Sequence, residues 1–203
     1  MASALRQEFF GRATLEVARA LLGQRLVRVL DGQRLSGLIA ETEAYLGPAD
    51  QASHAYRLTP RSAIMYGPPG YAYVYFIYGR NHCLNAVTEV AGKAGAVLIR
   101  ALIPQEGLAV MRARRGLVVD QGAHLTAAAS VRLVADGPGR LCQALAIDRT
   151  LNGVALTAPG LLYIEHGIEV PEAEVAITPR IGVRGDEETR LRPWRYLWRA
   201  SGR

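Results

Sequence analysis

The amino-acid sequence predicts a single α+β domain, built on a curved antiparallel β-sheet with short helices at its sides. The chain has 203 residues and half of them are hydrophobic, so it fits one domain with a substantial core. Strand-like segments follow one another with short turns, and neither a repeat nor a linker interrupts them. We therefore treat residues 1–203 as one domain, which ends in an Arg- and Trp-rich basic segment over residues 180–203.

The first part of the chain predicts a short helix and a β-hairpin. Apolar residues at helical spacing indicate a helix over residues 14–22, and Gly23 is a natural end for it. Alternating residues predict a strand over 25–30, and Asp31-Gly32 is a strong signal for a two-residue hairpin turn. The second strand of this hairpin is expected over residues 35–45.

The middle of the chain predicts a long loop followed by an antiparallel meander. Residues 46–70 contain proline turns at Gly47-Pro48, Thr59-Pro60 and Gly67-Pro68, and loops of this length in compact domains are usually functional. Strands are expected over 73–78, 82–90 and 96–103, with short turns between them. Tyr78 would lie at the tip of the first hairpin, where a large side chain can project.

The last part of the chain carries weaker signals. Residues 117–138 are rich in Ala and show no clear period. The expected elements are helices over 108–114 and 140–146 and strands over 154–156, 161–165 and 174–177.

The composition argues against several classes of protein. No apolar run reaches the roughly 18 residues that span a membrane, and the first residues lack a signal-peptide core. We therefore expect a cytoplasmic protein, associated with the nucleoid if DNA is its partner. The motifs HExxH, GxxxxGK[ST] and GxSxG are absent. Cys83 and Cys142 are isolated, which favours two buried thiols, and we expect no metal and no cofactor.

The charge balance is basic and is concentrated at one end. The net charge is +6, and residues 180–203 hold seven Arg against three acidic residues, which gives +4 there. Such a segment, interleaved with Trp and Tyr, fits a polyanionic partner. A solvated tail with a few packed aromatic residues explains the same pattern, and the charge alone does not decide between the two.

Two carboxylates and a group of tyrosines are the candidate chemistry of the chain. A period of two places Glu41, Glu43 and Tyr45 on one face of their strand. The two carboxylates could form a glycosidase-like pair, but they point the same way, which favours one catalytic and one structural carboxylate. Both could also be ordinary exposed strand residues. Four tyrosines fall within residues 71–78, a pattern that suits either a sheet core or a platform for a flat ring.

The ordered set of motifs resembles the alkyladenine DNA glycosylase family, the 3-methyladenine glycosylases of the methylpurine type. The resemblance runs from about residue 8 to about residue 183 and implies a fold similar to the C-terminal domain of methionyl-tRNA formyltransferase. The motifs that carry it are Glu-Thr-Glu-Ala-Tyr-Leu-Gly-Pro at 41–48, His54, Thr-Pro-Arg at 59–61, Tyr-Val-Tyr-Phe-Ile-Tyr-Gly at 73–79, Cys-Leu-Asn at 83–85, Leu-Ile-Arg-Ala-Leu at 98–102 and Gly-Pro-Gly-Arg-Leu-Cys-Gln-Ala-Leu at 137–145.

The resemblance implies an enzyme that flips a damaged purine out of duplex DNA and hydrolyses its N-glycosidic bond. Glu43 matches the general base that activates water, and Arg100 matches an arginine near that water. Tyr45, His54 and Tyr75 match the residues that line the pocket and stack on the extruded base. The implied product is an abasic site in DNA that carried an alkylated or deaminated purine.

The same resemblance implies the contacts that select the base and grip the duplex. Asn85 matches a pocket residue that clashes with the exocyclic amine of guanine, and Tyr78 matches the side chain that enters the minor groove. Apart from the resemblance, we expect Arg61, Arg80 and Arg180 to contact the DNA backbone, since arginine suits phosphates; Arg80 stands where relatives often carry Met. Double-stranded DNA is thus the expected partner, and relatives suggest a monomer.

Other functions remain open at this point. A binding module for damaged DNA or for RNA could use the same scaffold without catalysis, and a carbohydrate hydrolase could use Glu41 and Glu43. One further expectation rests on the residues alone, because strand cleavage by a glycosylase usually needs an amine that forms a Schiff base. Lys93 is the only lysine and lies in a Gly-flanked turn outside every motif. We therefore expect a monofunctional glycosylase.

Overall fold

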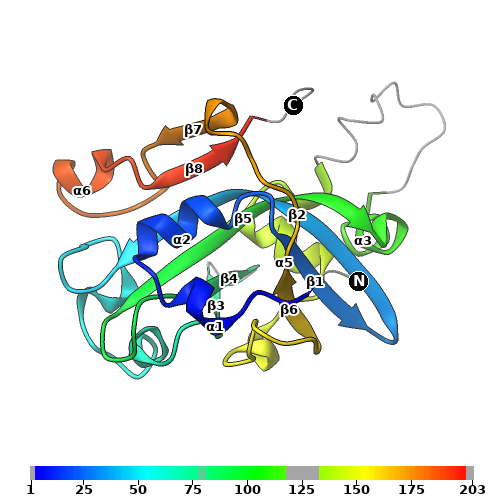
Figure 1. The fold of residues 1–203 in the computed structure, drawn as a ribbon, viewed down its shortest axis with the longest axis horizontal. Coiled ribbons are helices and arrows are strands. Elements are labelled where there is room, and N and C mark those ends of the chain that lie inside the picture. The colour runs from blue at the N-terminus through cyan, green and yellow to red at the C-terminus, as the bar shows by residue number, and fades with distance from the viewer. Residues whose placement is uncertain (1–2, 78, 80, 118–132, 200–203) are drawn as a thin grey trace.

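The computed structural model describes residues 3–77, 79, 81–117 and 133–199, and its centre is an antiparallel sheet. The described strands form one eight-stranded sheet in the order β3-β4-β5-β2-β1-β6, and β8 joins it by pairing with both β2 and β7 (Figure 1). The strands are β1 Arg25–Leu30, β2 Gln33–Leu46, β3 Ala72–Ile77, β4 Asn81–Val87, β5 Gly95–Glu106, β6 Leu162–Glu165, β7 Val175–Thr178 and β8 Arg195–Trp198.

The helices are short and lie around this sheet, which confirms the predicted α+β class. No helix within the described ranges is long and apolar enough to cross a bilayer. The α-helices are α1 Gln7–Phe10, α2 Thr14–Ala20, α3 Leu108–Arg114, α5 Pro138–Ala144 and α6 Glu187–Leu191, and the 3-10 helices are η1 His54–Tyr56, η2 Ala63–Tyr66, η3 Arg149–Leu151 and η4 Glu172–Glu174.

The β1–β2 hairpin forms as the sequence predicts. Asp31 and Gly32 have φ values of 50° and 75°, the positive pair that a two-residue turn of type I′ requires. Leu30 and Gln33 pair across this turn and set the register of the hairpin. The 14-residue strand β2 then continues beyond β1 and pairs with β5 and β8, so its centre is buried.

Side chains along β2 alternate between the two faces of the sheet, with core residues on one face and candidate site residues on the other. Thr42 donates a hydrogen bond from Oγ1 to the carbonyl of Ala18 in α2, at 2.8 Å, and Ala44 belongs to the main core. Because successive side chains point to opposite faces, Glu41, Glu43 and Tyr45 lie on the other face. The packing of α2 on β2 therefore fixes which face of the sheet carries the carboxylates.

Two expectations for the second half of the chain need correction, and one alternative that the charge left open does not hold. The helix predicted over 140–146 begins two residues earlier, because Pro138 occupies its first position. Residues 154–156 are not a strand; Ala155 makes one isolated bridge to Tyr71. The basic segment after residue 180 is not a solvated tail where it is described, since it forms α6 and β8 beside β7 and α2 (Figure 1).

Candidate active site

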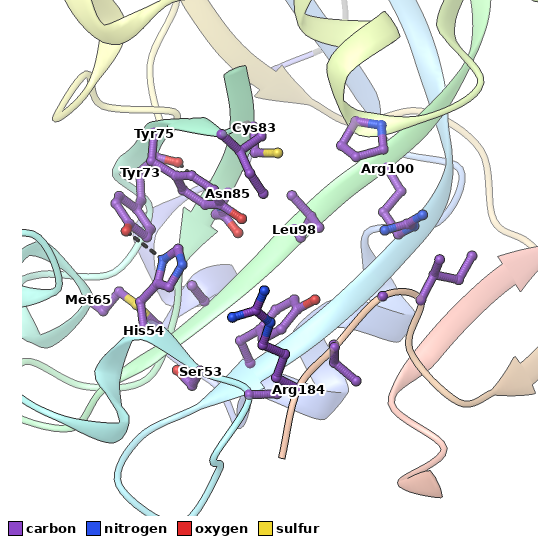
Figure 2. Close-up of a pocket in the computed structure, with 18 of the residues that line it drawn as sticks. Ser53, His54, Met65, Tyr73, Tyr75, Cys83, Asn85, Leu98, Arg100 and Arg184 are labelled. Carbon is purple, nitrogen blue, oxygen red and sulfur yellow. Dashed lines mark hydrogen bonds between the residues drawn. The ribbon is translucent and has the colours of Figure 1, made fainter. Parts of the chain in front are cut away.

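A cavity of about 570 Å³ opens on the face of the sheet that carries Tyr45. Alternate residues of β3, β4 and β5 form its wall, and residues 51–54, the start of α5 and residues 181–184 complete it. Figure 2 shows His54, Tyr73 and Tyr75 on one side and Arg100 on the other. The strand residues that line the cavity include Tyr73, Tyr75, Cys83, Asn85, Leu98 and Arg100.

The carboxylate of Glu43 lies beneath this cavity and is fully buried. Its Oε1 accepts a hydrogen bond from the backbone N–H of Ile181 at 2.7 Å. Its Oε2 accepts from the hydroxyl of Tyr45 at 2.8 Å and from Nη1 of Arg100 at 3.2 Å. Glu43 is not among the described residues that line the cavity, whereas Tyr45, Arg100 and Ile181, which supply its three donors, are.

Arg100 lies at an irregularity in the pairing of β2 with β5. The register pairs Ile39 with Leu102, Glu41 with Ala101 and Thr42 with Ile99, so Ala40 of β2 and Arg100 of β5 are both skipped in the ladder. Bulges re-aim side chains and are frequent beside active sites. The guanidinium donates from Nε to Glu41 Oε1 at 2.7 Å as well as to Glu43. Burial opposes the charge of Arg100, but the two carboxylates outweigh it and raise the pKa of Arg100.

The aromatic wall consists of interlocked rings. His54 and Tyr75 meet edge to face with centroids 4.6 Å apart, and the centroids of Tyr73 and Tyr75 are 5.2 Å apart. His54 Nδ1 and the hydroxyl of Tyr73 share a hydrogen bond of 2.8 Å, which fixes the imidazole. Burial, helped by the charge of Arg61, lowers the pKa of His54 to about 4. His54 therefore carries no charge at neutral pH.

Tyr45 faces this wall from β2 and stays a neutral phenol. Burial and the neighbouring carboxylate of Glu43 raise its pKa. The guanidinium of Arg180 lies over its ring at 4.8 Å and lies over the ring of Trp194 at 4.9 Å. Burial raises the pKa of Tyr75 in the same way. The described cavity wall thus presents uncharged aromatic groups to a ligand on two sides.

Asn85 is held rigidly at the back of the cavity. It lies on β4, is 3% exposed, and donates from Nδ2 to the backbone carbonyl of Tyr73 at 3.0 Å. A side chain fixed in this way cannot easily turn aside for a bulky substituent. The position of Asn85 suits the exclusion of the guanine amine that the family resemblance implies for it.

The arginines expected on the DNA backbone divide into three cases. Arg61 is exposed and stacks over the ring of Tyr75 at 4.7 Å, beside the aromatic wall. Arg180 needs correction, because it is buried and its guanidinium pairs with both oxygens of Asp50, at 2.6 and 2.8 Å. It holds the site together and is not available to a phosphate. Arg80, like Tyr78, lies outside the described residues.

Sequence reasoning missed four residues of the site. Ile181 supplies a donor to Glu43 from 138 positions away, and Arg184 lines the mouth of the cavity, as Figure 2 shows. Tyr73 orients His54, and Cys83 is a buried free thiol whose pKa is raised by burial. Only Tyr73 and Cys83 carried a signal, because they share the strand period of residues already singled out.

No group of three or more metal-ligating side chains occurs in the part of the chain that the structure describes. The fold and the site together define an α+β protein with a cavity for a flat ring, lined by aromatic groups and set above a buried carboxylate–arginine pair. This class can be narrowed by comparison with known proteins.

The model of the methylpurine-DNA glycosylase family matches residues 8–202. Three relatives share the name "Putative 3-methyladenine DNA glycosylase" and are similar over 95% of this chain. The protein of Methanocella arvoryzae is 47% identical over 90% of its own length, and those of Desulfitobacterium hafniense and Carboxydothermus hydrogenoformans are 41% and 44% identical over 93% of theirs. The chain belongs to the methylpurine-DNA glycosylase family.

Proposed function

We propose that this chain is a DNA glycosylase that flips alkylated or deaminated purines out of duplex DNA and releases them with a water activated by Glu43. The observation that carries the proposal is the buried carboxylate of Glu43, held by fixed donors directly beneath an aromatic cavity. Family membership and the names of the relatives support a 3-methyladenine substrate.

Glu43 has the capacity to act as the base. A carboxylate offers about four lone-pair sites, and described groups occupy three of them at Glu43. The remaining site can accept an O–H of water. The water oxygen then bonds to C1′ as the bond from C1′ to the purine nitrogen breaks, the purine leaves with the electron pair, and Glu43 takes the proton.

The charge of the cavity suits a cationic purine. A 3-alkyladenine or 7-alkylguanine carries a positive charge in DNA and leaves as a neutral base, so no acid is needed at the purine. Neutral His54 adds no repulsion, and the rings of Tyr45 and Tyr75 attract a cation by about 0.5–2 kcal/mol per contact. Neutral lesions such as hypoxanthine would need a proton from a group that we do not assign.

Rigid placement of Asn85 supports discrimination against normal guanine. Its amide is bonded to the backbone of Tyr73, so a guanine amine at that wall would meet a side chain that cannot move. Extrusion itself costs a few kcal/mol and is easiest for a damaged or mispaired base. Selection therefore combines the lower free-energy cost of extruding a damaged base with a pocket that excludes normal guanine.

The grip on duplex DNA is assigned to Tyr78 as the minor-groove wedge and to Arg61 and Arg80 as backbone contacts. Ile77 is the last residue of β3 and lines the cavity, and Tyr78 is the next residue in the sequence. Phosphate contacts by arginine make affinity depend strongly on salt. A monomer in the cytoplasm, acting on the nucleoid, is sufficient for this function.

The product is proposed to be an intact abasic site. Lys93 is 67% exposed, pairs with Glu89 at 2.8 Å and is absent from the described residues that line the cavity. Without the amine of Lys93 at the sugar, no lysine Schiff base can form. Borohydride added during reaction with lesion DNA should trap no covalent adduct, and an adduct would contradict this part of the proposal.

The test of the function is release of base from duplexes that each carry one 3-methyladenine, 7-methylguanine, hypoxanthine or ethenoadenine. Excision of at least one lesion, with abasic sites formed in equal number, is expected. Tight binding without release would instead support a non-catalytic module for damaged DNA. Preference for RNA without release would support the RNA-binding alternative.

A further inference from the structure

We propose that Glu41 is a positioning residue for Arg100, and that it keeps this arginine aimed at the reacting centre. The inference rests on the proposed function of Glu43 as the base. Glu41 is 5% exposed and accepts from Arg100 Nε at 2.7 Å. The same oxygen, Oε1, accepts from Arg195 Nε of β8 at 2.6 Å.

The irregular pairing at Arg100 is consistent with a need for such an anchor. The β2–β5 register skips Arg100, whose carbonyl accepts instead from the N–H of Gly137 at 3.0 Å. Its guanidinium reaches Glu43 only through Nη1, at a long 3.2 Å, whereas the bond to Glu41 is short. The orientation of the guanidinium is therefore set mainly by Glu41.

Charge balance supports the same role. Glu41 and Glu43 face Arg100 and Arg195, and no side chain of these four is more than 18% exposed. Two anions and two cations cancel, so Arg100 is not drawn wholly onto Glu43. One face of its charge stays available for the water or a phosphate beside the flipped nucleotide.

Replacement of Glu41 should change the orientation of the Arg100 guanidinium. With Glu41→Gln, Arg100 faces a single carboxylate, and Arg195 loses its charged partner. The guanidinium would then collapse onto Glu43 and occupy the site that the water needs. A displacement of about 1 Å at a reacting centre can cost on the order of 100-fold in rate.

The experiment compares single-turnover excision by wild-type enzyme and Glu41→Gln, with each protein saturating a duplex that carries one ethenoadenine or 7-methylguanine. We expect the rate constant to fall about 10- to 100-fold while the dissociation constant for the lesion duplex changes by less than about threefold. A loss in the chemical step without a loss in binding is not what simple destabilisation produces.

A matched control is Glu165→Gln. Glu165 is also buried on the same sheet and is also shared by two arginines, Arg34 and Arg25, but neither of these arginines is among the described residues that line the cavity, whereas Arg100 is. It should lose stability similarly, as measured by thermal unfolding, and keep the wild-type rate. A second arm combines Glu41→Gln with Arg100→Gln; the two effects should be strongly non-additive, because one acts through the other.

Several outcomes would overturn the inference. They are a Glu41→Gln rate close to that of the wild type, additive effects in the double variant, or an equal loss of rate in Glu165→Gln. If Glu41→Gln does not fold, Glu41→Asp replaces it in the same comparison of excision rate and duplex binding. The aspartate keeps the charge but moves the carboxylate away from Arg100. Failure of wild-type enzyme to release any base would refute the proposed function itself, which is a separate result.

Discussion

Replacement of Glu43 by Gln is the most direct perturbation of the proposed chemistry. The amide has nearly the same volume and keeps one acceptor oxygen, but it cannot take a proton from water. The best orientation turns its oxygen toward Tyr45 and Arg100, which leaves its NH₂ group facing the N–H of Ile181. One buried hydrogen bond is then lost, at a cost of about 1–3 kcal/mol in unfolding free energy.

The effect on catalysis should be much larger than the effect on stability. General base catalysis contributes about 10²- to 10⁴-fold, so single-turnover excision of 7-methylguanine should slow by that factor, or about 3–5 kcal/mol in activation free energy. The dissociation constant for the same duplex should change little. Glu89→Gln is a fair control, because Glu89 is a buried carboxylate that accepts from the backbone of Thr14 at 2.9 Å, away from the cavity. If Glu43→Gln excises the base as quickly as this control, Glu43 is not the base.

Three further predictions follow from contacts of the same site. Arg180→Met leaves buried Asp50 without its partner and should lower the unfolding free energy by about 3–5 kcal/mol, whereas exposed Arg190→Met should change it by less than about 0.5 kcal/mol in urea titrations. The pKa of His54 is lowered to about 4, below the ordinary value of about 6.5, so the unfolded chain binds a proton that the native state does not. The contribution of neutral His54 to the unfolding free energy should therefore be complete above about pH 6.5 and fall as the pH decreases toward 4. Thermal unfolding of wild type and His54→Gln over this pH range tests it, and a difference in stability that does not change with pH would contradict it. Asn85→Ala should raise release of normal guanine relative to 7-methylguanine by about tenfold, and an unchanged ratio in a mixed-substrate assay would remove Asn85 from selection.

The sequence pattern predicted those parts of the site that depend only on the alternation of side chains within one strand. Strand alternation placed Glu43 beside Tyr45 on one face and Tyr73 beside Tyr75 on another, because side-chain direction in a strand follows from the period of two. The irregular pairing at Arg100 could not be predicted, since a shift of register appears only when two strands are paired. Residues 154–156 look apolar enough for a strand but find no neighbouring edge beyond one bridge.

The burial of Arg180 shows a different limit of sequence patterns. Its position in an Arg-rich segment favoured a phosphate contact, since composition records charge but not the partner of each charge. In the fold, Asp50 from the loop after β2 meets it, and Tyr45 and Trp194 enclose its guanidinium. A pairing across 130 positions leaves no local trace.

The C-terminal segment supplies donors and charges that complete the site. A carboxylate at the middle of a sheet would be too costly to bury without donors, and the first part of the chain supplies Glu43 with only Tyr45 and Arg100. The segment after β7 adds the N–H of Ile181, and β8 adds Arg195 to the charge balance through Glu41. It follows that the geometry of the proposed base depends on the docking of this segment. Changes that loosen β8 from β2 should therefore reduce excision before they unfold the rest of the sheet.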